Sequence, residues 1–190
     1  MLNPETASAL FRRLDCEVWL VTACADGRRG GLIATFVRQA SIVPSLPRVV
    51  AGLAKRHYTH DLVEQSGAFA LHLLGEEHLE WARRFGLRSG RSIDKLDGLE
   101  VRSGRSGAPI LPEARGWLDC RVEARLDTGD RTIYLAEILD AKAPDPRPVL
   151  TVSRLLALVP PDWRREMDDQ REHDAVLDAE AIETWRAGRE

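Results

Sequence analysis

Short runs of apolar and strand-forming residues, separated by turn residues, recur through the first 142 positions of the chain. These runs predict strands at 17–25, 32–39, 48–54 and 68–74. The segment 25–31 is predicted to be a turn between the first two strands, because an Asp-Gly pair permits positive φ and two more glycines follow. Pro44 and Pro47 separate the second strand from the third, since proline cannot donate to a central ladder.

The same pattern predicts a hairpin from strands 117–126 and 132–141, with the turn 127–130 between them. The first of these strands is expected to bury one face and to expose the other. The buried face would carry Leu118, Cys120 and Val122, and the exposed face Asp119, Arg121 and Glu123.

Helical spacing is confined to shorter segments and to the end of the chain. Apolar positions three and four apart predict helices at 5–14, 59–65 and 76–85. Beyond Lys142, three prolines indicate a stiff link, and from Pro161 onward the chain is charge-dense and helical. We expect this tail to form one or two helices that pack on the rest of the chain or on a second subunit.

Many short strands and few helices predict a mainly β protein with flanking helices, built on a closed or partly closed antiparallel barrel. The composition shift near residue 148 divides the chain into a barrel domain, 1–148, and a helical extension, 149–190. A Gly-x-Gly-x-x-Gly turn and a P-loop are both missing from the sequence, so a nucleotide-like ligand would have to bind by another route.

Composition and charge exclude several classes of protein. With 27 basic and 30 acidic residues the net charge is −3, which gives no general attraction to nucleic acid. No uncharged run approaches the length of a membrane span, and the first residues lack the pattern of a secretory signal, so we expect a cytoplasmic protein. The three cysteines have no metal-ligand or disulfide spacing and are predicted to be buried thiols.

Candidate chemistry is concentrated in three segments, 30–41, 55–59 and 85–95, which combine hydroxyls, basic side chains and free backbone. Such a set suits a phosphate, which needs fixed N–H and O–H donors together with Lys or Arg. The alternative is that these cations are solvated surface charges. His57 and His60 could place metal ligands on one helical face, but a polar helix start is the preferred interpretation, so no metal is predicted.

The order and spacing of five motifs resemble the flavin reductase-like, FMN-binding split-barrel family, in particular its flavoredoxin-type branch. The motifs are Gly30–Ser41, Tyr58–His60, Ser89–Lys95, Asp119–Val122 and Gly129–Arg131. The resemblance implies a homodimeric Greek-key split barrel that binds FMN near the subunit interface. It also implies the cofactor-binding residues, which are Ala34, Thr35, Phe36, Val37 and Gln39 along the isoalloxazine ring, Lys55, Arg56 and Thr59 at the phosphate, and Ser89, Arg91 and Lys95 in a loop that closes over it.

The sequence departs from the family pattern at three places. The family's Asn-Gly is Gly30-Gly31 here, and its Thr is Ile33, so one expected side-chain donor is missing. The histidine of the family's Gly-Asp-His motif is Arg131. Arg131 could face a negatively charged substrate, face the second phosphate of a dinucleotide, or extend into solvent.

The function that follows from the resemblance is an NAD(P)H:flavin oxidoreductase that passes electrons through bound FMN to a small-molecule acceptor. Because the flavin carries the chemistry, the protein needs no acid, base or nucleophile of its own, and we predict no catalytic side chain. Two alternatives stay open. One is a non-enzymatic FMN electron carrier, which the replaced histidine favours, and the other is a cofactor-free dimeric interaction module, which Gly30 and Ile33 favour.

Overall fold

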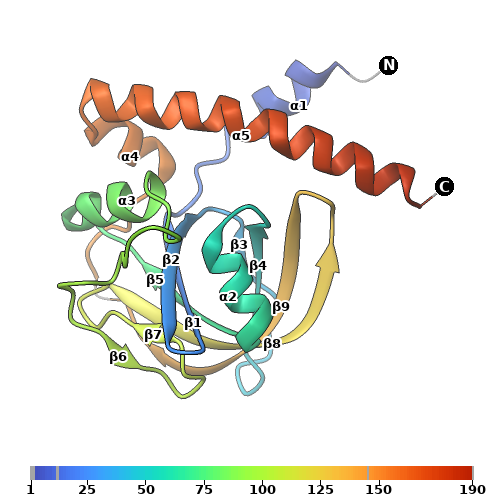
Figure 1. Cartoon of the computed structure of the whole chain (residues 1–190). Coiled ribbons are helices and arrows are strands. Elements are labelled where there is room, and N and C mark those ends of the chain that lie inside the picture. Colours follow the sequence, from blue (N-terminus) through green and yellow to red (C-terminus); the bar gives the residue numbers. More distant parts are fainter. Residues whose placement is uncertain (1–2, 12, 145, 190) are drawn as a thin grey trace.

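A computed structural model describes residues 3–11, 13–144 and 146–189 (Figure 1). The described ranges leave out residues 1–2, where no secretory signal is predicted. They also leave out residue 12, which falls inside the first predicted helix. In chain order the elements are α1 (Pro4–Phe11), β1 (Trp19–Ala25), β2 (Arg28–Ala34), β3 (Val37–Gln39), β4 (Arg48–Ala54), α2 (Tyr58–Ser66), β5 (Ala68–Leu73), η1 (Glu76–His78), α3 (Leu79–Gly86), β6 (Arg102–Ser103), β7 (Pro109–Ile110), β8 (Gly116–Asp127), β9 (Arg131–Lys142), α4 (Val152–Leu158) and α5 (Pro161–Ala187).

Seven antiparallel strands form one curved sheet in the order β2-β1-β5-β8-β9-β4-β3. The two edge strands, β2 and β3, follow each other in sequence, and only Thr35 and Phe36 lie between them. The chain therefore passes from one edge of the sheet to the other at this dipeptide. The result is the antiparallel split barrel with flanking helices that the sequence predicts, with its seam at Thr35-Phe36.

Close packing of α2 and α3 against β2 explains the glycines at the start of that strand. A Cβ on Gly30 would lie 3.1 Å from Leu62 Cδ1 and 3.3 Å from Thr59 Oγ1, both on α2. A Cβ on Gly31 would lie 2.7 Å from the Phe85 ring of α3. Glycine at these positions lets both helices approach the strand.

Two large apolar clusters and a small third one, around Ala70, Ala108 and Ile110, fill the molecule. The first lies inside the barrel and includes Val21, Leu53, Phe69 and Tyr134. The second lies between the barrel and the helices α3 and α4, and it includes Leu20, Phe85, Leu150, Leu155 and Val159. Residues just after the proline-rich link thus pack in the same cluster as residues of β1.

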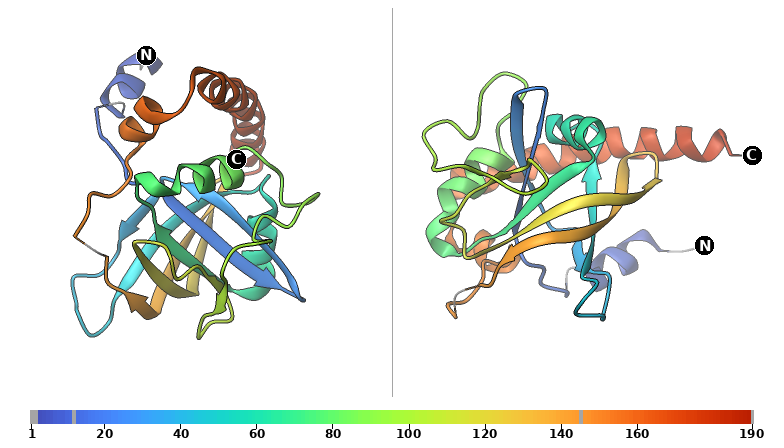
Figure 2. Two further views of the ribbon diagram at one scale, coloured as in Figure 1. Left: turned by 90° about the vertical axis from the view of Figure 1, so that its left-hand side faces the viewer. Right: turned by 90° about the horizontal axis from the view of Figure 1, so that it is seen from below.

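The last helix, α5, passes above the barrel from the region of α3 and α4 toward the β8–β9 hairpin (Figures 1 and 2). Trp163 and Met167 in its first turns pack on the second cluster, and the Arg83 guanidinium of α3 lies 4.4 Å from the centre of the Trp163 ring. The tail is therefore one long helix packed on the barrel, preceded by the short α4, which the sequence analysis did not predict.

Several expected boundaries need correction. The strand expected at 32–39 is two strands, because β2 begins at Arg28 and ends at Ala34, so Gly30 and Gly31 belong to the strand and not to the turn. Asp119, expected on an exposed face, is fully buried, because a bulge between Asp119 and Cys120 shifts the register of β8. Its carboxylate accepts hydrogen bonds from the backbone N–H of Ser106, at 2.9 Å, and from the Ser106 hydroxyl.

The prediction of three buried thiols is correct for Cys120 alone, since Cys16 and Cys24 are partly exposed. Within the described residues, no helix has both the length and the apolar character needed to cross a membrane.

Candidate functional site

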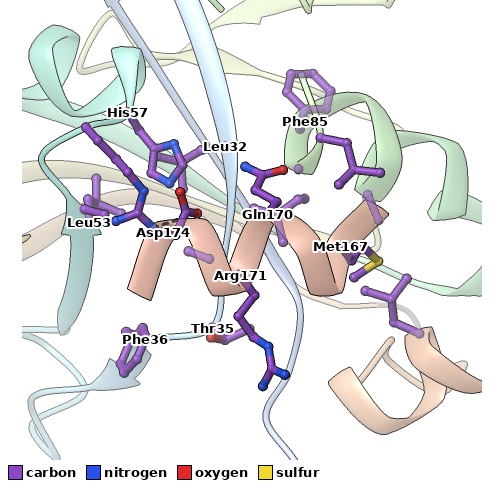
Figure 3. A pocket seen from close by; sticks show the side chains of 18 of the residues that line it. Leu32, Thr35, Phe36, Leu53, His57, Phe85, Met167, Gln170, Arg171 and Asp174 are labelled. Atoms are coloured by element: carbon purple, nitrogen blue, oxygen red, sulfur yellow. Dashed lines mark hydrogen bonds and ion pairs between the residues drawn. The ribbon is translucent and has the colours of Figure 1, made fainter. Parts of the chain in front are cut away.

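The seam of the barrel opens into a cavity of about 500 Å³ that α5 covers (Figure 3). The barrel wall comes from the end of β2, the Thr35-Phe36 crossing, β4 and α3, and the opposite wall is one face of α5. From the barrel side the lining includes Leu32, Ala34, Thr35, Phe36, Leu53, Arg56, His57, Phe85 and Arg131, and from α5 it includes Trp163, Met167, Gln170, Arg171, Asp174 and Asp178.

The crossing supplies one polar and one aromatic group to this cavity. The Thr35 hydroxyl makes no hydrogen bond within the part of the chain that the structure describes, so it is free for a ligand. Phe36 is 61% exposed, and the Arg131 guanidinium lies 4.7 Å from the centre of its ring. A planar apolar ligand in this cavity would find a hydroxyl donor or acceptor beside an aromatic face.

Two arginines on the barrel wall pair with carboxylates of α5. Arg56 Nη2 lies 2.9 Å from Asp174 Oδ2, and Arg56 Nη1 also pairs with Asp178. Arg131 Nη2 lies 3.2 Å from Asp178 Oδ2, and Arg131 Nε lies 2.6 Å from Asp130 Oδ2. Burial raises the pKa of Asp178, although both arginines oppose that shift.

These pairs bear on one of the three alternatives for Arg131, its extension into solvent, and leave the two anionic partners open. Its side chain is 21% exposed, lines the cavity and is paired on two sides, so it does not extend freely into solvent. Arg56 keeps one unused donor, since its buried Nε has no hydrogen-bond partner.

His57 lies directly before α2 and faces the same cavity, close to Asp174 (Figure 3). Burial, with the nearby Arg56 charge, lowers the pKa of His57 to about 4, so the imidazole is neutral at pH 7. The His57 side chain makes no capping hydrogen bond to the first turn of α2. The beginning of α2 therefore has N–H groups that its N-cap residue does not satisfy, and it directly follows Arg56 and His57 of the cavity wall.

Four of the predicted cofactor-binding residues line the cavity, namely Ala34, Thr35, Phe36 and Arg56. Four others gather around Tyr58, the first residue of α2, and do not line it. Arg91 pairs with Asp61 at 2.7 Å and stacks over the Tyr58 ring, while Lys95 Nζ donates to the carbonyls of Phe85 and Arg88. The remaining members of this group are Thr59, which is buried at the α2 start, and Ser89, whose hydroxyl accepts from the Arg91 N–H.

The other three predicted residues point elsewhere. Val37 is buried in the barrel core, and together with Gln39 it lines a different cavity beside Trp19. Lys55 forms an ion pair with Asp127 at 2.6 Å in the β8–β9 hairpin. The structure thus brings together the crossing and Arg56, and separates them from Gln39 and Lys55.

Neither the α5 wall nor the position of His57 in the cavity lining was predicted from the sequence. A signal was present for α5, because Trp163, Met167, Gln170, Asp174 and Asp178 recur at helical spacing on one face. Two acids that continue a stripe begun by Trp163 and Met167 indicate that this face of the helix meets basic groups.

The side chains that line the cavity can bind a ligand and hold it in one orientation. Its walls combine apolar side chains, a free hydroxyl, a neutral imidazole and the guanidiniums of Arg56, Arg83, Arg131 and Arg171, a set that suits a planar ring carrying an anionic group. Across residues 3–11, 13–144 and 146–189 there is no group of three or more His, Cys, Asp or Glu side chains arranged to hold a metal ion.

Comparison with known proteins places most of the chain in one family. A family model described as the flavin reductase like domain matches residues 11–154. The ferric-chelate reductase (NAD(P)H) of Archaeoglobus fulgidus is 32% identical over 143 residues, which cover 74% of this chain and 83% of that protein. The diflavin flavoprotein A 1 of Synechocystis sp. is 25% identical over 131 residues, and the alignment covers 68% of this chain but 22% of that longer protein.

A solved structure shows the same architecture. The crystal structure of flavoredoxin from Methanosarcina acetivorans matches with a TM-score of 0.64 at 25% identity, over 69% of this chain and 70% of that one. The family match ends at residue 154, so α5 and the wall it contributes to the cavity lie outside the matched segment.

Proposed function

The chain belongs to the flavin reductase-like domain family, and from that premise we propose that it is an FMN-dependent oxidoreductase that carries electrons from NAD(P)H to a small-molecule acceptor. The observation that supports the assignment best is the cavity at the barrel seam, where Thr35 and Arg56 flank apolar walls. Its volume, about 500 Å³, is in the range of small-molecule and cofactor sites.

The residues present fit this cofactor. The crossing at Ala34–Phe36 would lie along the ring system, with the Thr35 hydroxyl available to a ring nitrogen or oxygen. Arg56 and the start of α2 would hold the phosphate, since a helix N-terminus and a guanidinium both favour an anion. Thr59, Ser89, Arg91 and Lys95 would support the α2 start from the far side of Tyr58.

When bound, FMN supplies the redox chemistry, accepting a hydride and releasing electrons singly or in pairs. The chain's own residues bind the cofactor, orient it and limit the access of water. The apolar side chains of Leu32, Leu53 and Phe85 exclude water from one side, and α5 covers the other. His57, neutral at pH 7, can donate or accept one hydrogen bond in the cavity without adding charge.

The phosphate assignment is tested by titrating FMN into the protein and following the loss of flavin fluorescence. Arg56→Ala is expected to weaken binding at least tenfold, or about 1.4 kcal/mol, because the variant removes the cavity's charge at the α2 start. Arg28→Ala, which removes an exposed arginine from the β1–β2 turn region, is the matched control and should leave the affinity unchanged. An Arg56 variant with wild-type affinity would exclude this residue from the site.

The electron donor is tested separately. Oxidation of NADH and NADPH is followed at steady state with FMN present, and we expect turnover with at least one of them. The pairing of Arg131 with Asp178, at a position where relatives resembling this chain carry histidine, favours the electron carrier as the second candidate. No oxidation of either donor by FMN-loaded protein would select that candidate.

We further propose a homodimer located in the cytoplasm, as the sequence analysis predicts. Support comes from apolar side chains left open on the β3–β4 loop, where Ile42 is 94% and Leu46 is 67% exposed. Light scattering of the purified chain measures the mass directly, and a monomer at micromolar concentration would refute the dimer.

A further inference from the structure

The helix α5 is attached to the barrel only through exposed and partly exposed residues. None of its described residues is buried, although it is 27 residues long. Its first turns are held by Trp163 and Met167, and its last turns lie on the β8–β9 hairpin, where a Cβ on Gly129 would lie 2.8 Å from Ala181 O and from Trp185 Cβ. Between these two apolar contacts, the helix is held by ion pairs.

Those ion pairs use the cations that an anionic ligand would need. Asp174 and Asp178 occupy both terminal nitrogens of Arg56, and Asp178 also pairs with Arg131. With Asp130 included, three carboxylates surround two guanidiniums. Arg83 and Arg171 also line the cavity, but a dianion that approached Arg56 would meet the carboxylates of Asp174 and Asp178 and would find both terminal Arg56 nitrogens already used.

We propose that Asp174 and Asp178 compete with the flavin phosphate for Arg56. The helix α5 is then a cap over the cavity, and its two carboxylates must separate from Arg56 before a phosphate-bearing ligand binds. The inference rests on the proposed function, because it takes Arg56 as the phosphate partner. It goes beyond the family resemblance, because α5 lies outside the segment that the family model matches.

The connection between α4 and α5 is suited to such a movement. Val159 is buried with Leu155 in the second cluster, whereas the next two residues are Pro160 and Pro161, which have no N–H to bond to the preceding turn. No backbone N–H of Pro160 or Pro161 bonds α5 to α4, so α5 can leave the barrel as a separate helix while α4 stays packed. This separation breaks the exposed and partly exposed contacts of α5 and no contact of a fully buried α5 residue.

A consequence is selectivity between flavins that differ in charge. Riboflavin has the ring system of FMN but no phosphate, so it does not compete with the two carboxylates. The cap therefore lowers the affinity for FMN relative to riboflavin. Removing the two carboxylates should raise the affinity for FMN and leave the affinity for riboflavin unchanged.

The test compares FMN and riboflavin binding, by quenching of flavin fluorescence, in the full-length wild type and in the double variant Asp174→Asn with Asp178→Asn. We expect the double variant to bind FMN at least tenfold more tightly and riboflavin with less than a twofold change. Glu166→Gln with Glu172→Gln is the matched control, since it removes two exposed acids from the same helix away from the cavity, and it should change neither affinity.

A second readout follows the helix itself. In the wild type, saturating FMN should increase tryptic cleavage within α5, which contains Arg164, Arg165, Arg171 and Arg186, and riboflavin should not. FMN affinity that is unchanged in the Asn variant, or equal gains for both flavins, would overturn the competition while the flavin site stands. Failure of every protein to bind either flavin would overturn the proposed function and the inference with it.

Discussion

At the scale of single residues, His72 shows how the fold fixes the protonation state of a buried group. The Leu111 N–H donates to His72 Nε2 at 3.0 Å, so Nδ1 must carry the proton that is shared with the Leu20 carbonyl at 3.1 Å. Both ring nitrogens are used by the neutral imidazole, and the side chain is fully buried. Burial lowers the pKa of His72 to about 4.

This histidine makes the stability of the protein depend on pH in a defined window. Between about 6.5, the ordinary pKa, and about 4, the unfolded chain binds a proton that the folded chain does not. The free energy of unfolding should therefore fall as the pH is lowered through that window, by at most about 3 kcal/mol from this group. Urea unfolding at pH 7 and at pH 4.5 measures the loss.

His57, whose pKa is also lowered to about 4, contributes in the same window, and two further measurements test the part of His72. His173→Gln changes an exposed histidine of α5 and should leave the dependence on pH as it is in the wild type. NMR of the folded protein should show that the His72 ring does not titrate between pH 7 and pH 5. A His72 ring that protonates near pH 6.5 while the protein stays folded would contradict the assignment.

At the scale of elements, the strand β2 depends on a residue without a side chain. Gly31 faces the Phe85 ring of α3 at a separation that leaves no room for a methyl group. Phe85 is itself buried in the second cluster and lines the cavity, so it cannot move aside without disturbing both. The register of β2 and the position of α3 are thus set by the same contact.

We expect Gly31→Ala to destabilise the protein by about 1–3 kcal/mol through overpacking between β2 and α3. Thermal unfolding measures the change. Gly188→Ala, after the end of α5, is the control, because a Cβ there meets its nearest atom at an ordinary 3.7 Å. Equal melting temperatures for the wild type and the Gly31 variant would show that the Phe85 ring accommodates the methyl group.

Elements were predictable where local pattern and tertiary environment agree. Arg48–Ala54 is the predicted strand to the residue, because prolines precede it and a continuous apolar run fills it. The break between β2 and β3 could not be predicted, since 32–39 is one continuous apolar pattern and the closure of the barrel decides where it bends. The burial of Asp119 depends on a bulge and on Ser106, thirteen residues away, which alternation within one strand cannot reveal.

At the scale of the whole molecule, the cavity has two walls with different origins. The barrel wall, with Thr35 and Arg56, lies within the family-matched segment and was predicted from the resemblance. The α5 wall, with Asp174 and Asp178, lies outside it and is brought to the cavity by packing between segments more than a hundred residues apart. A local sequence pattern cannot reveal contacts between residues so far apart in the chain. The ion pairs that Arg56 forms with α5 could therefore be found only in the folded structure.

The same arrangement bears on where the folding unit ends. Leu150 is bonded to the residues that flank β1 and β5, because its carbonyl accepts from the Val18 N–H and its own N–H donates to the Leu74 carbonyl, each at 2.8 Å. Together with the buried Leu155 and Val159, it closes the second cluster. Burial of three such aliphatic side chains contributes roughly 5–9 kcal/mol, comparable to the whole stability of a domain.

A chain that ends after Pro160 should therefore fold and unfold cooperatively, and a chain that ends after Pro148, at the boundary predicted from composition, should not. The first truncation removes α5, which has no buried residue and whose main apolar contacts are partly exposed. Circular dichroism should show a loss of helix with the strands retained, and thermal melting a single transition at a moderately lower temperature. If both truncated chains melt cooperatively, the barrel does not need α4, and the boundary at residue 148 is the correct one.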